Sequence, residues 1–221
     1  MPVTGCQDRW LFTTEPGLQI QSYFLKTTAF AVVFIFKENI FMSIIKNLKT
    51  DENGWFANGT FTSKSLFKGE MKVCIFIDDG ATEQDAERCI SHYNDLLSKK
   101  EIISDLKEKV ANFFLYMYNE WGLMNDIYDN IFESLKPIMK AYKNGDDLIS
   151  YLYNPVLYAT QHLENEVGYC ISCECPWEPE HQCSIIIRND KLLYVGPVEG
   201  FTPWEDEEDY YCIWNDNSED N

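Results

Sequence analysis

The strongest hydrophobic pattern in the chain lies between residues 101 and 122. Six apolar residues recur there at spacings of three or four positions, the repeat of one face of an α-helix: Ile102, Leu106, Val110, Phe113, Met117 and Trp121. Burying six such side chains contributes on the order of 10 kcal/mol before the entropy of ordering is subtracted. The pattern therefore predicts a long helix that organises the core.

A shorter helix is predicted before it, over residues 83–99. Thr82 is a good N-terminal capping residue, because Asp85 follows three positions later and can complete a capping box. Apolar residues then recur at helical spacing up to about residue 97.

A third helix is predicted over residues 123–142. Pro137 lies inside it and predicts an interruption or a kink, because proline cannot donate the helical hydrogen bond. The Asn-Gly pair at residues 144–145 is a typical helix end. Asp146 is then expected to cap a short helix that ends near residue 151.

Strand patterns lie on both sides of the helices. Before them, residues 54–61 resemble a strand-turn-strand unit, and residues 70–77 alternate as a strand that ends at a turn over residues 78–80. After them, four short runs bounded by turn residues predict strands at 156–160, 168–175, 183–188 and 191–195, with residues 189–190 as a hairpin turn. The expected fold is α+β, with a small N-terminal β element, central helices and a separate C-terminal antiparallel β-meander.

The first 41 residues differ from the rest because they lack a sustained amphipathic pattern. The longest apolar run, residues 27–36, has ten uncharged residues, about half of what a membrane span needs. Asp8 and Glu15 are atypical of a signal peptide. We interpret residues 1–41 as an N-terminal extension or an over-extended start before Met42, and a buried strand at 30–36 is the alternative. Residues 42–198 then form a single domain and residues 199–221 a tail.

Composition narrows the classes of function. The chain has 36 acidic and 18 basic residues and a formal net charge of −18, which argues against nucleic-acid binding because that requires a surplus of Lys and Arg. A basic protein partner is easier to accommodate. Eight cysteines in 221 residues are too few for a disulfide scaffold, so we expect a cytoplasmic protein with reduced thiols and no membrane association.

Residues 170–183 concentrate four cysteines and a histidine: Cys170, Cys173, Cys175, His181 and Cys183. If residues 168–175 form a strand, Cys173 and Cys175 share one face and Cys170 points to the other. Zinc binding by Cys173, Cys175, His181 and Cys183 is one interpretation, although structural zinc sites normally have a second, distant ligand pair. Buried free cysteines that need no cofactor are the interpretation we favour.

A catalytic role for this segment would use Glu178 or Glu180 as a base, or a thiolate activated by His181. The sequence contains no H-E-x-x-H, G-x-S-x-G, P-loop or G-x-G-x-x-G motif. We therefore favour a structural loop over residues 176–182, in which Trp177 packs inward and Glu180 or His181 bonds to neighbouring backbone. His92 and His162 are expected to have solvated or hydrogen-bonded structural roles.

Residues 177–181 (W-E-P-E-H) and the following run 184–196 resemble an uncharacterised bacterial domain family. Its members have a W-[DE]-x-E-H-G turn before a hairpin that ends in V-x-x-V-G, and Gln182 stands here in place of the usual glycine. The resemblance covers about residues 53–198. It implies a cytoplasmic α+β domain of unknown activity, often regarded as a toxin-immunity-type protein. Trp177, Glu180 and His181 are the matching positions.

The tail combines acidic and aromatic residues. Residues 199–221 contain nine acidic residues, no Lys or Arg, and five rings: Phe201, Trp204, Tyr210, Tyr211 and Trp214. A purely solvating tail contains few rings. The pattern fits either a last edge strand over residues 210–214, with Tyr211 and Ile213 as its apolar positions, or an acidic surface that binds a basic protein.

We expect a protein that acts by binding another protein rather than by catalysis, in the form of an immunity protein that neutralises a basic toxin. The candidate binding residues are Trp177, Glu180, His181, Trp204, Tyr210, Tyr211 and Trp214. Two alternatives remain open. One is a metal- or cysteine-dependent enzyme built on the Cys173, Cys175, His181 and Cys183 cluster, and the other is a structural accessory module.

Overall fold

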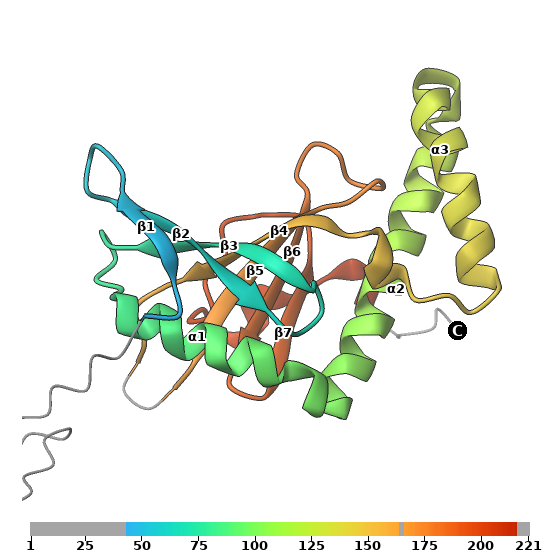
Figure 1. Ribbon diagram of the computed structural model, residues 1–221. Helices are drawn as coiled ribbons and strands as arrows, with labels where there is room; N and C mark the ends of the chain where they lie inside the picture. The colour runs from blue at the N-terminus through green and yellow to red at the C-terminus, as the bar shows by residue number, and fades with distance from the viewer. Residues whose placement is uncertain (1–42, 164–165, 216–221) are drawn as a thin grey trace, which may run out of the picture. The chain divides into compact units, whose positions relative to one another are not determined.

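Seven strands form one sheet whose spatial order follows the chain from β1 to β7. The strands are β1 (Lys46–Thr50), β2 (Phe56–Ser63), β3 (Gly69–Phe76), β4 (Tyr153–Ala159), β5 (Gly168–Glu174), β6 (Cys183–Arg188) and β7 (Lys191–Gly196). The structure, a computed structural model, describes residues 43–163 and 166–215 (Figure 1). The predicted extension over residues 1–41, the alternative strand at 30–36 and the end of the tail lie outside the described residues.

The α+β class and the C-terminal antiparallel meander are confirmed, but the prediction of two separate β units is wrong. Residues 72–75 of β3 pair in parallel with residues 156–159 of β4, which joins both groups of strands into one sheet. A parallel pair requires a long crossover connection. The three helices supply it, so the whole helical segment is an insertion between two neighbouring strands.

The predicted strand-turn-strand unit at residues 54–61 is also wrong, because Asn58 and Gly59 lie inside β2. A Cβ atom at Gly59 would lie 2.7 Å from the Ile45 side chain, so the glycine permits a close approach of neighbouring chain segments rather than a turn. The turn lies earlier, where Gly54 has a φ of +77°. The polar strand β1 before it has no hydrophobic alternation that could have predicted it.

The helices are α1 (Glu83–Asp95), α2 (Lys100–Leu123) and α3 (Asn125–Lys143). The capping box at the start of α1 is confirmed: Thr82 Oγ1 accepts from the Asp85 backbone N–H at 3.2 Å, and Asp85 Oδ2 accepts from that of Thr82 at 2.9 Å. The predicted face of α2 is buried, with Met117 half-buried at its edge. Figure 1 shows α3 packed beside α2.

Two details after α2 differ from the prediction. The helix α3 continues through Pro137 without interruption. Pro137 is exposed, so water can satisfy the carbonyl that loses its partner, while the buried Leu135 and Ile138 hold the helix in place. Asp147, not Asp146, caps the short 3₁₀-helix Leu148–Tyr151, since its carboxylate accepts from the Ile149 backbone N–H at 3.0 Å.

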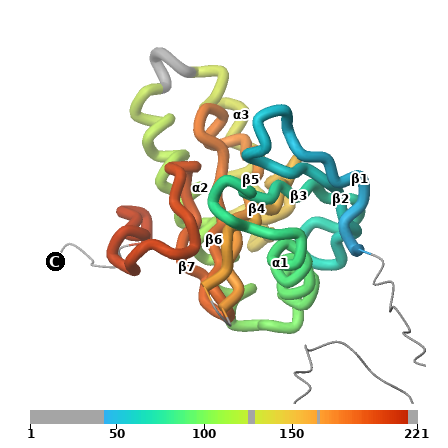
Figure 2. The backbone as a smooth tube through the Cα atoms, turned by 90° about the vertical axis from the view of Figure 1, so that its left-hand side faces the viewer, coloured from blue at the N-terminus to red at the C-terminus, as the bar shows by residue number. Residues whose placement is uncertain are grey.

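The sheet has a hydrophobic layer on each face. The larger core lies between the sheet and the helices, and a smaller cluster lies on the outer face beneath residues 201–214. Figure 2 shows α1 and the C-terminal segment on opposite sides of the strands. The tail is therefore a covering layer of the sheet.

Candidate functional site

The predicted site segment is the connection between β5 and β6, residues 175–182, called here the Trp177 loop. Trp177 has an exposed fraction of 0% and packs edge-on against Phe113 and Phe114 of α2. The Trp121 Nε1–H donates to the Trp177 carbonyl at 2.8 Å. The inward packing of Trp177 is confirmed, and its ring offers no surface to a partner in this conformation.

A buried carboxylate organises the Trp177 loop. Glu178 Oε1 accepts from the backbone N–H groups of Glu180 at 3.2 Å and of His181 at 3.1 Å. From the sequence we expected Glu180 or His181 to bond to neighbouring backbone. The side chains of both residues are exposed instead, and Glu178 makes these bonds. Gln182 has a φ of +63°, a conformation that glycine adopts without strain, which explains physically why a glycine suits this position.

The cysteines on either side of the loop lie in the core. Cys173 pairs with Cys183 across β5 and β6, and Cys175 is buried in the same cluster, while Cys170 points to the opposite face as predicted. Burial raises the pKa of Cys175 to about 12 and that of Cys183 well above its usual value. These thiols are therefore protonated at neutral pH.

His181 is not brought into the cysteine cluster. Its side chain is 63% exposed, and its Nδ1 atom lies 3.3 Å from the Glu178 carboxylate. In the ranges 43–163 and 166–215, no group of three or more His, Cys, Asp or Glu residues is placed to hold a metal ion. The four residues of the zinc interpretation thus do not converge in this arrangement.

The other two histidines are enclosed. His92 Nδ1 lies 3.0 Å from the Tyr169 hydroxyl, and its Nε2 lies 3.1 Å from Asp190, which also pairs with Lys99. This network connects α1 to the β6–β7 turn, and burial lowers the pKa of His92. The pKa of His162 is lowered by burial as well. Both histidines have hydrogen-bonded positions in the fold, as expected.

The tail packs on the outer face of the sheet, but not as an edge strand. Tyr210 and Cys212 are buried, whereas Tyr211 and Ile213 are 67% and 59% exposed. The segments Glu207–Tyr210 and Ile213–Asn215 are 3₁₀ turns. The predicted strand over residues 210–214 is therefore wrong. Tyr210 and Cys212 face the sheet, whereas the prediction had Tyr211 and Ile213 as the apolar positions.

Two tryptophans attach the tail. Trp204 Nε1–H donates to Thr160 Oγ1 at 2.9 Å, and its ring lies over Gly168, where a Cβ would be 2.8 Å away. Trp214 Nε1–H donates to the Val195 carbonyl at 2.9 Å. Its ring packs against Phe113 with the centroids 5.1 Å apart. Both rings, which we expected to bind a partner, hold the tail on the fold.

The attached segment presents a group of carboxylates, and residues 205–213 are called here the acidic lobe. The Tyr210 hydroxyl donates to the Thr202 carbonyl at 2.7 Å and accepts from the Glu205 backbone N–H at 3.1 Å. Glu207 pairs with Lys191 at 2.6 Å, which lowers the pKa of the glutamate. The lobe is thus fixed to the sheet by both burial and charge.

Three exposed carboxylates of the acidic lobe make no ion pair within the described residues: those of Asp206, Glu208 and Asp209. Beside them lies a hollow of about 510 Å³ whose lining includes Leu192, Leu193 and Tyr211. The lining also includes Lys109, Lys191, Glu207 and Glu208, so the surface combines fixed charge with a recess of mixed apolar and charged character. The sequence signalled the charge, but not which rings anchor the lobe and which remain exposed.

An α+β protein with an acidic lobe on the outer face of its sheet is the class that the fold and this surface define. A family model for a domain of unknown function, DUF6985, matches residues 44–202, and the chain belongs to this family. No curated protein and no solved structure matches the chain. The matched region includes the Trp177 loop and ends before the acidic lobe. Within the described residues, no helix has the length and apolar character needed to cross a membrane.

Proposed function

We propose that this protein acts by binding a basic protein, and that the acidic lobe is its contact surface. The observation that carries the proposal is that Asp206, Glu208 and Asp209 are exposed and unpaired within the described part of the chain, on a segment fixed by the buried Tyr210 and Cys212. A flexible acidic tail would lose conformational entropy on binding. A fixed one has already lost most of it on folding, which favours affinity.

The hollow beside the lobe suits the partner chemistry. Lys and Arg side chains have an apolar stem and a charged end, and the stem packs favourably on apolar surface. The exposed Tyr211 in the lining would receive such a stem, and Glu208, which also lines the hollow, would receive the charge. The two lysines of the lining, Lys109 and Lys191, are already paired with Asp105 and Glu207. The formal net charge of −18 would accelerate the encounter with a basic partner.

The partner that we propose is a basic toxin, and the protein would then be of the immunity type. This class is the one implied by the resemblance of the Trp177 loop region, and the acidity of the chain supports it. We place the protein in the cytoplasm, because the seven described cysteines are free and buried. A cysteine-dependent reaction needs a thiolate, and burial keeps these thiols protonated.

The proposal is tested by capture from the native cell at low salt, with elution by high salt. The decisive variant is Asp206→Asn/Glu208→Gln/Asp209→Asn, which leaves the Glu207–Lys191 ion pair intact. A matched control, Glu52→Gln/Asp78→Asn/Asp79→Asn, removes three exposed carboxylates elsewhere on the surface. We expect a basic protein that is retained by the parent and the control and lost by the lobe variant. Equal retention by all three proteins, or no captured protein, would contradict the proposal.

A further inference from the structure

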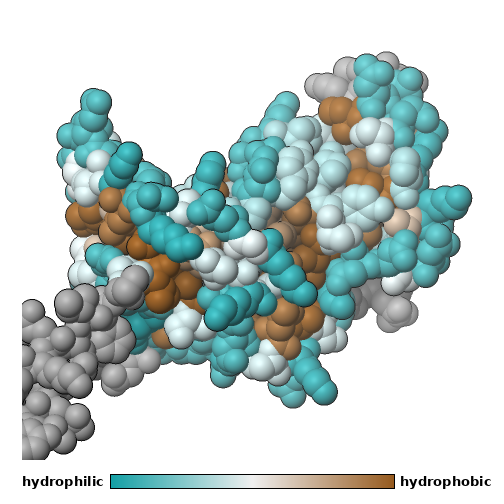
Figure 3. All heavy atoms as spheres, viewed as in Figure 1, coloured by the Kyte–Doolittle hydropathy of each residue, from teal (hydrophilic) through white to brown (hydrophobic). Residues whose placement is uncertain are grey.

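A second recess lies on the helix-covered side of the sheet, far along the chain from the acidic lobe. It has a volume of about 450 Å³ and lies between the β2–β3 connection, the 3₁₀ turn Leu96–Ser98 after α1, the start of α2 and residues 147–152. Figure 3 shows hydrophobic surface between the β2–β3 connection and α2. The volume is within the range of pockets that bind small molecules, about 300–1,000 Å³.

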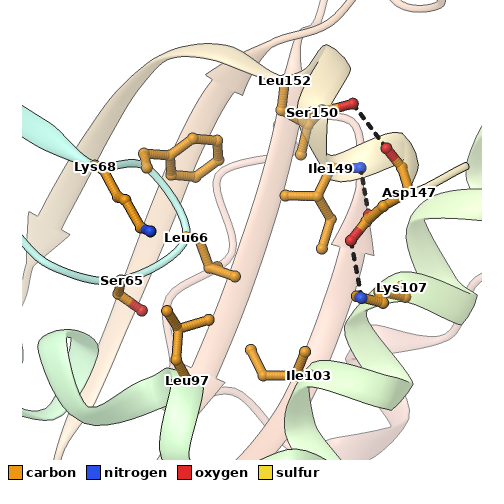
Figure 4. Close-up of a pocket in the computed structure, with 11 residues that line it drawn as sticks. Ser65, Leu66, Lys68, Leu97, Ile103, Lys107, Asp147, Ile149, Ser150 and Leu152 are labelled. Atoms are coloured by element: carbon orange, nitrogen blue, oxygen red, sulfur yellow. Dashed lines mark hydrogen bonds and ion pairs between the residues drawn. The ribbon is translucent and has the colours of Figure 1, made fainter.

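Five of the eleven lining residues are aliphatic, and Phe67 adds an aromatic ring. Leu66, Leu97, Ile103, Ile149 and Leu152 provide its walls (Figure 4). Leu97 is 47% exposed at the rim, a large apolar residue left in contact with water. An apolar chain that covered these residues would remove this surface from water.

The polar groups at one end of the pocket already have partners. Lys107 Nζ lies 2.9 Å from the Asp147 carboxylate, and that carboxylate also accepts from the Ile149 backbone N–H at 3.0 Å. Ser150 Oγ donates to the Asp147 carbonyl at 2.8 Å. Figure 4 shows these contacts as a connected group on the side of α2. The polar groups at this end are therefore satisfied by protein partners and need no ligand.

The opposite end has a buried hydroxyl without a partner, that of Ser65, and an exposed lysine, Lys68. Ser65 is buried, and its hydroxyl has no hydrogen-bond partner within the described residues. Lys68 makes no ion pair there either, and Figure 4 shows its side chain directed toward the middle of the pocket. A buried hydroxyl without a partner is costly and uncommon in native proteins. Lys68 is exposed, so its ammonium group is solvated and free to pair with a ligand at the pocket.

We propose that this pocket binds a small aliphatic carboxylate, with the chain along the leucine and isoleucine walls and the carboxylate at Lys68 and Ser65. A single negative charge matches the single unpaired ammonium group. A dianion such as a phosphate is a poorer match, because Lys107 is already neutralised by Asp147 and the protein is strongly acidic. The proposal is independent of the acidic lobe, since none of the lobe residues lines this pocket.

Titration of the full chain with decanoate, followed by heteronuclear NMR and calorimetry, tests the proposal. We expect saturable binding at one site, with decanol of the same chain length at least about tenfold weaker because it lacks the charge. Lys68→Gln should weaken the binding of decanoate about tenfold. Lys64→Gln is the matched control, because Lys64 lies on the same connection but does not line the pocket. The affinity of this variant for decanoate should stay within about twofold of the parent value.

Two more substitutions separate binding from folding. Ser65→Ala should raise the thermal stability of the ligand-free protein, because it removes an unpartnered hydroxyl, and should weaken decanoate at the same time. Leu97→Glu places a negative charge at the exposed rim and should abolish decanoate binding, whereas Leu97→Gln should retain most of it. Non-saturable binding, equal affinity for decanol, or binding of a peptide carboxyl terminus but not of decanoate would overturn the proposal. The lobe variant should bind decanoate normally, so the two proposals fail separately.

Discussion

The indole N–H of Trp121 donates a 2.8 Å hydrogen bond to the backbone carbonyl of Trp177. This bond joins the long core helix α2 to the loop inside residues 170–183, the segment in which the sequence concentrates cysteine and histidine. The ring of Trp177 lies on Phe113 and Phe114 of the same helix. The loop is thus part of the packing of the core, and its residues owe their pattern to that packing.

Removing the donor should destabilise the protein. Trp121→Phe keeps a large ring but leaves the carbonyl of the buried Trp177 without its partner, so we expect the free energy of unfolding to fall by about 1–3 kcal/mol. Urea unfolding measures the change. Trp55→Phe, at an exposed tryptophan, is the control and should shift the value by less than about 0.5 kcal/mol. Similar effects of the two substitutions would show that the bond contributes nothing.

The Trp177 loop should depend on Glu178 and not on its exposed neighbours. Glu178→Ala removes the acceptor of two backbone N–H groups and should cost about 1–3 kcal/mol of unfolding free energy. Glu180→Ala and His181→Ala alter exposed side chains and should each change it by less than about 0.5 kcal/mol. A larger cost for His181→Ala than for Glu178→Ala would reverse this assignment.

The thiols of the folded protein should be unreactive. Burial raises the pKa of Cys175 and Cys212 to about 12 each, and the seven described cysteines are all buried. In a Cys6→Ser variant, a disulfide-exchange reagent at neutral pH should label the native protein slowly and all seven thiols after unfolding. A chelator should leave the unfolding curve unchanged. Rapid native labelling, or stoichiometric zinc in the purified protein, would contradict the assignment of these cysteines to the core.

Stability should fall in mild acid because of His92. Burial lowers its pKa below the usual 6.5, so below pH 6.5 the unfolded chain binds a proton more readily than the folded one. The free energy of unfolding is therefore fully retained above pH 6.5 and decreases as the pH falls from 6.5 through the folded-state pKa. His92→Gln should make this slope shallower in urea titrations at several pH values, with His162 responsible for part of the remainder. An unchanged slope would show that His92 does not titrate as inferred.

Local sequence patterns predicted the helices well because each pattern is satisfied within one element. The Thr82 capping box and the apolar face of α2 depend only on neighbours three or four residues away. The joining of β3 to β4 was not predictable in the same way, because residues 72–75 and 156–159 are far apart in the sequence and pair across a connection that contains all three helices. Glycine is common both in turns and where neighbouring chain segments approach closely. Gly59 was read as part of a turn, but it allows the close approach of the Ile45 side chain to β2.

The candidate site was only partly accessible from the sequence for a similar reason. The acidity of the tail and the orientation of Cys170, Cys173 and Cys175 follow from composition and strand alternation. Which of Tyr210 and Tyr211 faces inward does not follow from them, because the lobe forms 3₁₀ turns that are held by contacts outside it, such as the Glu207–Lys191 ion pair and the Trp214–Val195 hydrogen bond. Ser65 carries no sequence signal at all, since its missing hydrogen bond exists only in the packed structure.

The central claim, that fixed surface carboxylates bind a basic partner, is tested most directly by one affinity measurement. Once a captured partner is purified, its Kd is measured with the parent, the lobe variant and the three-carboxylate control, at about 0.1 M and about 1 M salt, where the screening length falls from about 10 Å to about 3 Å. Removal of three carboxylates worth about 0.5 kcal/mol each should weaken binding about tenfold at low salt for the lobe variant alone, and this difference should shrink at high salt. Equal affinities of the lobe variant and the control at low salt would contradict the account.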